Sequence, residues 1–337
     1  MAKVTLQSIA DRVGVSRMTV SNAFSRPDQL SADLRAKILA AADELGYGGP
    51  DPAARALARG RTGSVGLLIN GSLSEAFEDA VSAAFLASVS DALSERGLAL
   101  TLLPASSDQS FVPARDVAVD GALVYICDPA APDIAWLERR QVPVVVVDHN
   151  VDGDVASVNV DDRSGARLAA QHLVDLGHRR VGILTLETDP AAGNYPARER
   201  MLGWHDALDP AGAETVVVAT PFAPPEAAYD AALGLLDRPD RPTAVLCFSD
   251  AFAVATIRAA EALGLTVPAD LSVVGFDDSV LAAGSRPPLT TVHQEVPAKG
   301  RAAVAAIAEV MSGGRPAPVL LPTSLVVRES TAPPPAS

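Results

Sequence analysis

The sequence predicts an N-terminal all-α head followed by a two-lobed α/β body with doubly wound parallel sheets. Around a glycine turn in residues 4–24, apolar residues recur at helical spacing. From residue 64 onward, short apolar strands alternate with amphipathic helices, which is typical of parallel sheets covered on both faces. This alternation runs through two similar blocks, about 64–160 and 161–290, and therefore indicates two lobes with a cleft between them.

The head begins with VTLQSIADRVGVSRMTVSNAF, which has the pattern of two short helices joined by a tight turn. Apolar residues follow Leu6 at i+3, i+4 and i+7, and Thr5 stands in the N-cap position. Gly14 ends this helix and Ser16 can cap a second one. The second helix would bury Val20 and either Ala23 or Phe24.

Polar and long side chains share the outward face of the second helix, namely Arg17, Met18, Ser21 and Asn22. An arginine guanidinium matches guanine O6 and N7, an asparagine amide matches adenine, and a methionine can meet a thymine methyl. A small helical bundle with a solvated polar face is the alternative, but the glycine, small-residue and apolar positions all keep helix-turn-helix spacing. We therefore expect this helix to enter the major groove of double-stranded DNA.

Charge is distributed unevenly along the chain, whose formal net charge is −14. Residues 1–62 contain nine Lys and Arg against six Asp and Glu, a net of +3, so residues 63–337 carry −17. A basic head on an acidic body suits a protein in which only the head contacts phosphate.

Helix signals continue past the first two helices. Ser31 can cap a third helix that Gly46 ends, which completes a DNA-binding domain over residues 1–48. The hinge segment 49–62 holds only about two turns of helix, starting at Asp51, and so short a helix is not stable alone in water. A flexible linker is the alternative, but Arg55, Leu57 and Arg59 favour a segment that orders on DNA.

Eight apolar strands are expected in the body, which spans residues 63–330, and amphipathic helices are expected between most of them. The strands are placed at 65–70, 98–103, 121–127, 143–148, 179–186, 214–219, 243–248 and 271–277.

Along almost its whole length the chain resembles the LacI/GalR family of transcriptional regulators. The motifs that carry the resemblance are the helix-turn-helix stretch, AARALARGRTGSVGLLI, HLVDLGHRRVGIL, RERMLGW, VPADLSVVGFDD, PPLTTVHQE and LVVRES. The resemblance implies a periplasmic-binding-protein-like body whose chain crosses between lobes near Val160, Thr291 and Leu321. Lobe 1 would comprise about 63–160 and 293–320, lobe 2 about 161–290 and 321–330, and 331–337 would be a disordered tail.

The family's hinge helix wedges a leucine into the minor groove, and Leu57 is the matching position here. The residues expected to contact DNA are therefore Thr5, Ser16, Arg17, Met18, Ser21, Asn22, Arg55, Leu57 and Arg59. The resemblance also implies a homodimer or tetramer on an operator, with a small effector, most readily a sugar, held between the lobes.

The positions that match the family's ligand contacts are Asp148, Arg200, Ser249 and Asp277. Two carboxylates and a guanidinium can bracket the hydroxyls of a sugar, and Phe222 can offer an apolar wall. We also place Phe77 at the site, in a first-lobe loop that is longer than is usual in the family. Helix N-capping is the alternative for each carboxylate, and we assign Asp250 to a cap.

Enzymatic motifs are missing from the sequence: it contains no G-x-S-x-G elbow, P-loop or G-x-G-x-x-G, and its five histidines form no metal-ligand pattern. We therefore expect no catalytic residue, metal or cofactor. The sequence also has no apolar run of about 20 residues and no signal peptide, so a cytoplasmic protein without a membrane partner is expected. An enzyme fused to a DNA-binding head and a transporter's solute-binding protein are the alternative functions.

Overall fold

The computed structural model describes residues 4–69, 72–105, 110–125, 132–149, 155–187, 194–221 and 226–335. The chain forms two compact units, Met1–Gly63 and Ser64–Ser337. No helix in the described ranges is long and apolar enough to cross a membrane.

The first unit opens with three helices, each begun by a side-chain cap. They are α1 (Leu6–Val13), α2 (Arg17–Ser25) and α3 (Ala32–Glu44), with a 3-10 turn, Pro27–Gln29, between the last two. Their caps are Thr5, which forms a reciprocal capping box with Ser8, followed by Ser16 and Ser31. Gly14 takes the left-handed conformation after α1, with a φ of 76°, so the turn between the first two helices depends on glycine.

Seven buried side chains form the core of this head: Ile9, Ala10, Val20, Ala23, Ile38, Ala41 and Ala42. Of the two alternatives for the second helix, Ala23 is the fully buried residue. Phe24 lies at the margin and meets Tyr47 edge to face, with ring centroids 5.8 Å apart. Small residues at the centre allow the helices to approach closely, while the aromatic pair covers one side.

A fourth helix, α4 (Pro52–Arg59), follows as a separate two-turn segment. The Asp51 carboxylate accepts hydrogen bonds from the first free amides of the helix, Pro52 occupies its first turn, and Gly60 ends it in the left-handed conformation. Its ends are therefore well specified although the described part of the helix buries no side chain.

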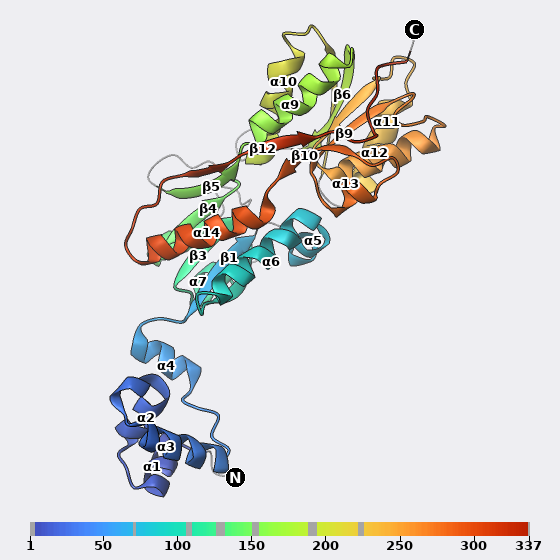
Figure 1. The fold of residues 1–337 in the computed structure, drawn as a ribbon. Coiled ribbons are helices and arrows are strands. Elements are labelled where there is room, and N and C mark those ends of the chain that lie inside the picture. The colour runs from blue at the N-terminus through green and yellow to red at the C-terminus, as the bar shows by residue number, and fades with distance from the viewer. Residues whose placement is uncertain are drawn as a thin grey trace. The chain divides into compact units, whose positions relative to one another are not determined.

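The body contains two six-stranded sheets (Figure 1). The first has the order β11-β5-β4-β3-β1-β2 and is parallel throughout. Its strands are β1 (Ser64–Ile69), β2 (Ala99–Pro104), β3 (Gly121–Tyr125), β4 (Val144–Val147), β5 (Ala156–Val160) and β11 (Val319–Leu321).

The second sheet has the order β12-β10-β9-β8-β6-β7, and only β12 runs antiparallel. Its strands are β6 (Arg180–Leu186), β7 (Glu214–Thr220), β8 (Ala244–Cys247), β9 (Ser272–Asp277), β10 (Thr290–Gln294) and β12 (Thr323–Val326).

Helices cover both faces of each sheet, which gives each lobe two apolar cores. Lobe 1 carries α5 (Leu73–Glu78), α6 (Ala80–Ser94), α7 (Pro113–Asp116), α8 (Pro132–Arg139) and α14 (Val296–Met311). Lobe 2 carries α9 (Asp162–Asp175), α10 (Tyr195–Leu208), α11 (Glu226–Leu236), α12 (Asp250–Ala262) and α13 (Val280–Gly284). Figure 1 shows α14 beside α6, although the two helices are far apart in sequence. The predicted doubly wound α/β class is confirmed.

The chain passes between the sheets three times, at 160–162, 294–296 and 321–323. We expected the second passage near Thr291, but β10 continues through Gln294 in the second sheet. The difference matters because Gln294, the last residue of β10, is a buried residue that lines the cavity of the body.

Two local expectations need correction. The segment expected to be a long first-lobe loop forms helix α5 and the first part of α6, because Ser72 and Asp79 each cap a helix start. The disordered tail expected from residue 331 does not begin there: the Thr331 hydroxyl pairs with His172 at 2.9 Å, and the Ala332 amide donates to Ser272 at 3.0 Å.

Candidate functional site

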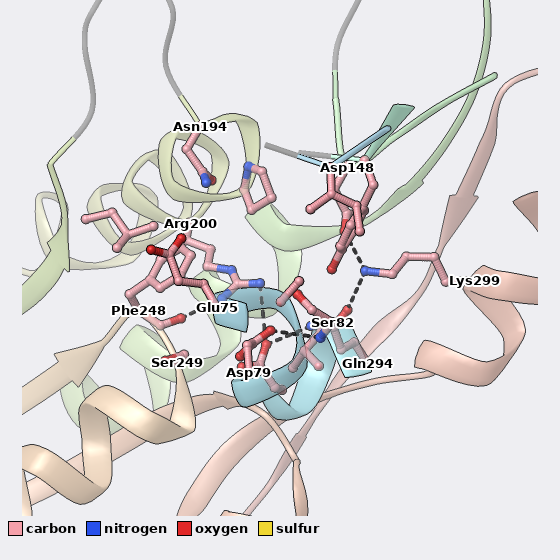
Figure 2. Close-up of a pocket in the computed structure, with 17 residues that line it drawn as sticks. Glu75, Asp79, Ser82, Asp148, Asn194, Arg200, Phe248, Ser249, Gln294 and Lys299 are labelled. Carbon is pink, nitrogen blue, oxygen red and sulfur yellow. Dashed lines mark hydrogen bonds and ion pairs between the residues drawn. The ribbon is translucent and has the colours of Figure 1, made fainter. Parts of the chain in front are cut away.

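The carboxyl ends of strands from both sheets meet around a cavity of about 240 Å³ in the body. This is where open α/β sheets place their ligands. The polar and charged lining residues are Glu75, Asp79, Ser82, Tyr125, Asp148, Asn194, Arg200, Ser249, Asp277, Gln294 and Lys299, and the apolar ones include Ile69, Leu186 and Phe248. Figure 2 shows Arg200 and Asn194 on one side of the cavity and Asp148 and Lys299 on the other.

Arg200, from α10, is the best-anchored side chain on the second-lobe side. Its Nε donates to Asp162 Oδ1 at 2.8 Å, Nη1 donates to the Phe248 carbonyl at 2.5 Å, and Nη2 lies 3.6 Å from Asp277 Oδ1. The guanidinium also lies 3.6 Å from the centroid of the Phe276 ring. These contacts fix the guanidinium before any ligand arrives.

The carboxyls around Arg200 are poorly solvated, and their pKa values reflect it. Burial raises the pKa of Asp162 to about 6 despite the opposing charge of Arg200. Burial raises the pKa of Asp277 well above its ordinary value, Arg200 opposes this, and the nearby charge of Asp250 adds to it. Burial lowers the pKa of Arg200, but the neighbouring Asp162 and Asp277 raise it by more, so the guanidinium stays positively charged.

On the first-lobe side, Asp148 pairs with a buried lysine. Lys299 Nζ, from α14, donates to Asp148 Oδ2 at 2.5 Å and to Gln294 Oε1 at 3.3 Å. Gln294 Nε2 then donates to Asp277 Oδ1 at 2.7 Å. A continuous polar chain therefore runs along the cavity wall from Asp148 in lobe 1 to Arg200 in lobe 2.

Asp148, which follows β4, and Asp277, the last residue of β9, both have positive φ angles. Asp148 has a φ of 53° and Asp277 a φ of 115°, both in the left-handed half of conformational space that L residues rarely adopt. Strain of this kind is concentrated at functional sites, where it aims a side chain. Both carboxyls are almost fully buried at the cavity.

Ser249 and not Asp250 is the cap at the start of α12, contrary to the assignment of Asp250 from the sequence. Ser249 is the N-cap of α12, accepting from the Phe252 amide, and it also lines the cavity. Asp250 is not a cap of that helix: its carboxylate accepts from the Ser279 amide at 2.7 Å and from the Thr291 hydroxyl at 2.5 Å. It therefore ties the start of α12 to β10 and the segment after β9.

Four of the six residues predicted for the effector site line this cavity: Asp148, Arg200, Ser249 and Asp277. Contrary to the prediction, Phe77 does not line the cavity. Glu75 and Ala76 are the residues of α5 that line it, and the Phe77 side chain is 58% exposed. Phe222 lies outside the described residues.

Several lining residues were not predicted, and two of them carry a readable signal. Lys299 stands at i−4 from Ala303 on the apolar face of α14, so it is a lone charge in a buried stripe. Glu75 completes the capping-box pattern Ser-x-x-Glu with Ser72, which marks a helix start rather than a loop. Tyr125, Asn194 and Gln294 carry no comparable signal.

The head presents the predicted DNA-contacting residues of α2 without burying their ends. Arg17 is exposed, Met18 is 70% exposed, and Ser21 and Asn22 are half-buried. The Asn22 amide donates to Gln29 at 3.3 Å. Thr5 and Ser16 serve as caps of α1 and α2.

In the hinge, Arg55 and Arg59 are exposed, and Leu57 is 87% exposed, the largest value among the exposed large hydrophobic side chains in the described ranges. Burying such a side chain elsewhere would gain roughly 1.5–3 kcal/mol. Within the described residues this side chain contributes nothing to an apolar core, so it is available for a contact outside its own helix.

In the described part of the chain, no group of three His, Cys, Asp or Glu side chains could hold a metal ion. The histidines of HLVDLGHRR have structural partners: the His178 ring contacts Thr243 Oγ1, Ser272 Oγ and the Ala332 carbonyl. Burial lowers the pKa of His178, which favours its neutral form.

Comparison with known proteins gives matches over both units. Residues 5–49 match the description "Bacterial regulatory proteins, lacI family", and residues 170–331 match a "Periplasmic binding protein-like domain". HTH-type transcriptional regulator Rv3575c of Mycobacterium tuberculosis is 38% identical over 356 residues, covering 99% of this chain and 98% of that protein.

Two solved structures extend the comparison to three dimensions. A transcriptional regulator CelR-cellobiose complex has a TM-score of 0.72 at 30% identity, covering 97% of this chain and 100% of that one. The lac repressor dimer bound to operator and the anti-inducer ONPF has a TM-score of 0.83 at 27% identity, covering 98% and 99%. This chain therefore belongs to the lacI family of bacterial regulatory proteins and is a DNA-binding transcriptional regulator, not an enzyme.

Proposed function

We propose that this regulator is a repressor that binds a pseudo-palindromic operator as a homodimer and releases or tightens its hold when a small sugar enters the cleft of the body. The observation that carries the effector part is the cavity itself, in which Asp148, Arg200 and Asp277 from two lobes face one space. Carboxylates accept from sugar hydroxyls and a guanidinium donates to them, so the set suits a polyhydroxylated ligand.

The related solved structures support both halves of the proposal. One is titled as a CelR-cellobiose complex and another as a lac repressor dimer bound to operator. A single α2 offers one short recognition surface, and a helix as short as α4 gains little stability by itself. Two copies on two half-sites would supply both a longer recognition surface and a partner for α4.

The dimer is tested with duplexes selected from a randomised DNA pool by the full-length protein. We expect the selected site to contain two inverted half-sites, and the complex to contain two chains by light scattering. Tight, specific binding of one chain to one isolated half-site would contradict the proposal.

The hinge is tested by Leu57→Ser. Since the Leu57 side chain is exposed, the free energy of unfolding should stay within about 0.5 kcal/mol of wild type. If Leu57 wedges between base steps, the variant should bind the selected duplex more weakly and bend it less in fluorescence energy transfer. Val280→Ser, at a body residue that is 83% exposed, is the matched control and should change neither quantity. Equal bending by wild type and Leu57→Ser would exclude the wedge.

A further inference from the structure

Lys299 is a charged side chain in an interior position of the first lobe. It is 1% exposed, and its ammonium lies 5.7 Å from the ring centroids of both Phe85 and Tyr125, which stack on each other. A buried ammonium is costly unless it is paired and hydrogen-bonded. Asp148 and Gln294 take two of its three N–H donors, and the residue lines the cavity.

Only one of the two carboxylate oxygens of its partner, Asp148, accepts a hydrogen bond from the described residues. Oδ2 accepts from Lys299, whereas Oδ1 is buried and has no hydrogen-bond partner among the described residues. The side chain is 5% exposed and lines the cavity. Because a buried acceptor without a partner costs free energy, this oxygen indicates a donor supplied by a ligand.

The second lobe presents the same combination at the other side of the cavity. There a fixed cation, Arg200, stands 3.6 Å from a carboxylate, Asp277, and Gln294 joins Asp277 to Lys299. Figure 2 shows Arg200 on one side of the open space and Asp148 with Lys299 on the other, and Asp277 also lines the cavity. Each pair offers both a donor and an acceptor, and a hydroxyl group can satisfy both.

Charge and size restrict the ligand further. Four carboxyls line the cavity, Glu75, Asp79, Asp148 and Asp277, against two cations that are both already paired. Burial raises the pKa of Asp277 well above its ordinary value, so Glu75, Asp79 and Asp148 are the carboxyls that would oppose a phosphate or carboxylate group on a ligand. The volume of about 240 Å³ also lies below the range of about 300–1,000 Å³ that is usual for drug-sized ligands.

We infer that Lys299 is a specificity-determining residue of the effector site: with the free oxygen of Asp148 it reads hydroxyls at one edge of an uncharged, single-ring polyol, opposite Arg200 and Asp277. This inference rests on the proposed function of the cleft as an effector site. Binding to protein without DNA tests it, so its outcome is separate from operator recognition.

The probes are glucose, galactose, mannose and ribose, each compared with its 1-phosphate as the anionic counterpart. A ligand that binds only the native state raises the thermal unfolding midpoint, and calorimetry then gives its affinity. We expect at least one neutral probe to stabilise the full-length protein and its anionic counterpart to bind at least about tenfold more weakly.

Two variants separate ligand recognition from a purely structural ion pair. Lys299→Met keeps an apolar side chain of similar length but leaves Asp148 as an uncompensated buried charge, so it should lower the unfolding midpoint. Adding Asp148→Asn removes that charge, and the double variant should regain most of the lost midpoint. If the pair binds ligand, the double variant should still have an affinity about 10- to 100-fold below wild type.

Several outcomes would overturn the inference. They are stabilisation by no neutral probe, equal or tighter binding of an anionic counterpart, and full recovery of both midpoint and affinity in the double variant. Arg163→Met, which breaks the exposed pair with Asp206 in lobe 2, is the control and should leave probe affinity unchanged. Loss of affinity in that control would mean that the effect is not local to Lys299.

Discussion

At the scale of single residues, Arg200 shows how a side chain that lines the cavity can also stabilise the fold. It is 5% exposed and carries an ion pair with Asp162 that is buried on both sides. Arg200→Ala would leave the Asp162 carboxylate buried without its cation, so the free energy of unfolding should fall by about 3–5 kcal/mol in urea titrations.

The control for this prediction is another arginine that pairs with an aspartate in the same lobe. Arg163 contacts Asp206 at 2.6 Å, but its side chain is 49% exposed. Exposed pairs contribute about 0–1 kcal/mol, so Arg163→Ala should change stability little. Equal losses in the two variants would show that the burial of the Arg200 pair is not what matters.

Asp250 should make stability depend on pH. Burial raises its pKa from 3.8 to about 6, so the native state binds the proton more tightly than the unfolded chain. The contribution of this proton to the free energy of unfolding is fully present below about pH 4 and is lost as the pH rises through about 6. Asp250→Asn cannot titrate, so between pH 4.5 and 7.5 wild type should lose about 1–3 kcal/mol relative to the variant.

Urea titrations of both proteins at several pH values check this prediction. Asp162, which titrates in the same window, is present in both proteins and cancels in the difference, whereas the charge of Asp250 also raises the pKa of Asp277, so that coupling is included in the measured loss. Asp206→Asn is the control: its hydrogen bond with Arg163 lowers the pKa of Asp206, so the difference should stay constant over this range. A constant difference for Asp250→Asn would contradict the raised pKa.

At the scale of elements, the packing of α9 against α10 depends on a glycine. A Cβ at Gly203 would lie 2.2 Å from the Arg163 carbonyl oxygen and 2.9 Å from Ala166 Cβ, so the two helices would have to separate. Gly203→Ala should therefore destabilise the body by about 1–3 kcal/mol.

Gly234, in α11, is the matched control because a Cβ there would meet no atom within 4 Å. Gly234→Ala should stabilise the protein by about 0.5–1 kcal/mol through helix propensity alone. Thermal or urea unfolding of both variants measures whether each one loses or gains stability relative to wild type. A stabilising Gly203→Ala would mean that the close approach of α9 and α10 is not required.

How far the sequence predicts the elements depends on how strong their local signals are. The apolar strands β1 to β4 and β6 to β9 and most of the helices between them are predicted, because their period is set by burial on one or two faces. The short strands β5, β10, β11 and β12 are not, since their pairing is decided by the crossovers rather than by local pattern. Helix α5 was mistaken for a loop although Ser72 and Glu75 mark its start.

The residues of the candidate site also differ in how far local sequence signals predict them. Asp148, Ser249 and Asp277 follow predicted strands, so the strand ends place them at the cleft. Lys299 comes from α14, which follows the second crossover: its place in an apolar stripe indicates burial, but the crossover decides that the buried charge lies at the cavity. Phe77 was misplaced because its position depends on the rotation of α5.

At the scale of the whole molecule, the helix-turn-helix head and the cavity belong to different units, so the proposed regulation requires a coupling free energy between the two sites. The two lobes contribute carboxylates and cations to one cavity, and the chain crosses between them at 160–162, 294–296 and 321–323. A ligand that contacts both lobes can favour one arrangement of the lobes, but it shifts the equilibrium only through its differential affinity for the two states.

Asp277→Asn tests this coupling, because Asp277 faces the cavity while Gln294, which donates to it, lies at the second crossover. The measurement is an operator titration with and without whichever neutral probe stabilises wild type, together with calorimetry of that probe. In wild type the two operator affinities should differ by about 5- to 150-fold, the usual range of such couplings. In Asp277→Asn their ratio should fall toward one as probe affinity falls, whereas Asp206→Asn, at a side chain outside the cavity, should keep the wild-type ratio. Wild-type probe affinity in Asp277→Asn would remove Asp277 from the effector site, and a lost operator affinity without probe would assign it to the fold instead.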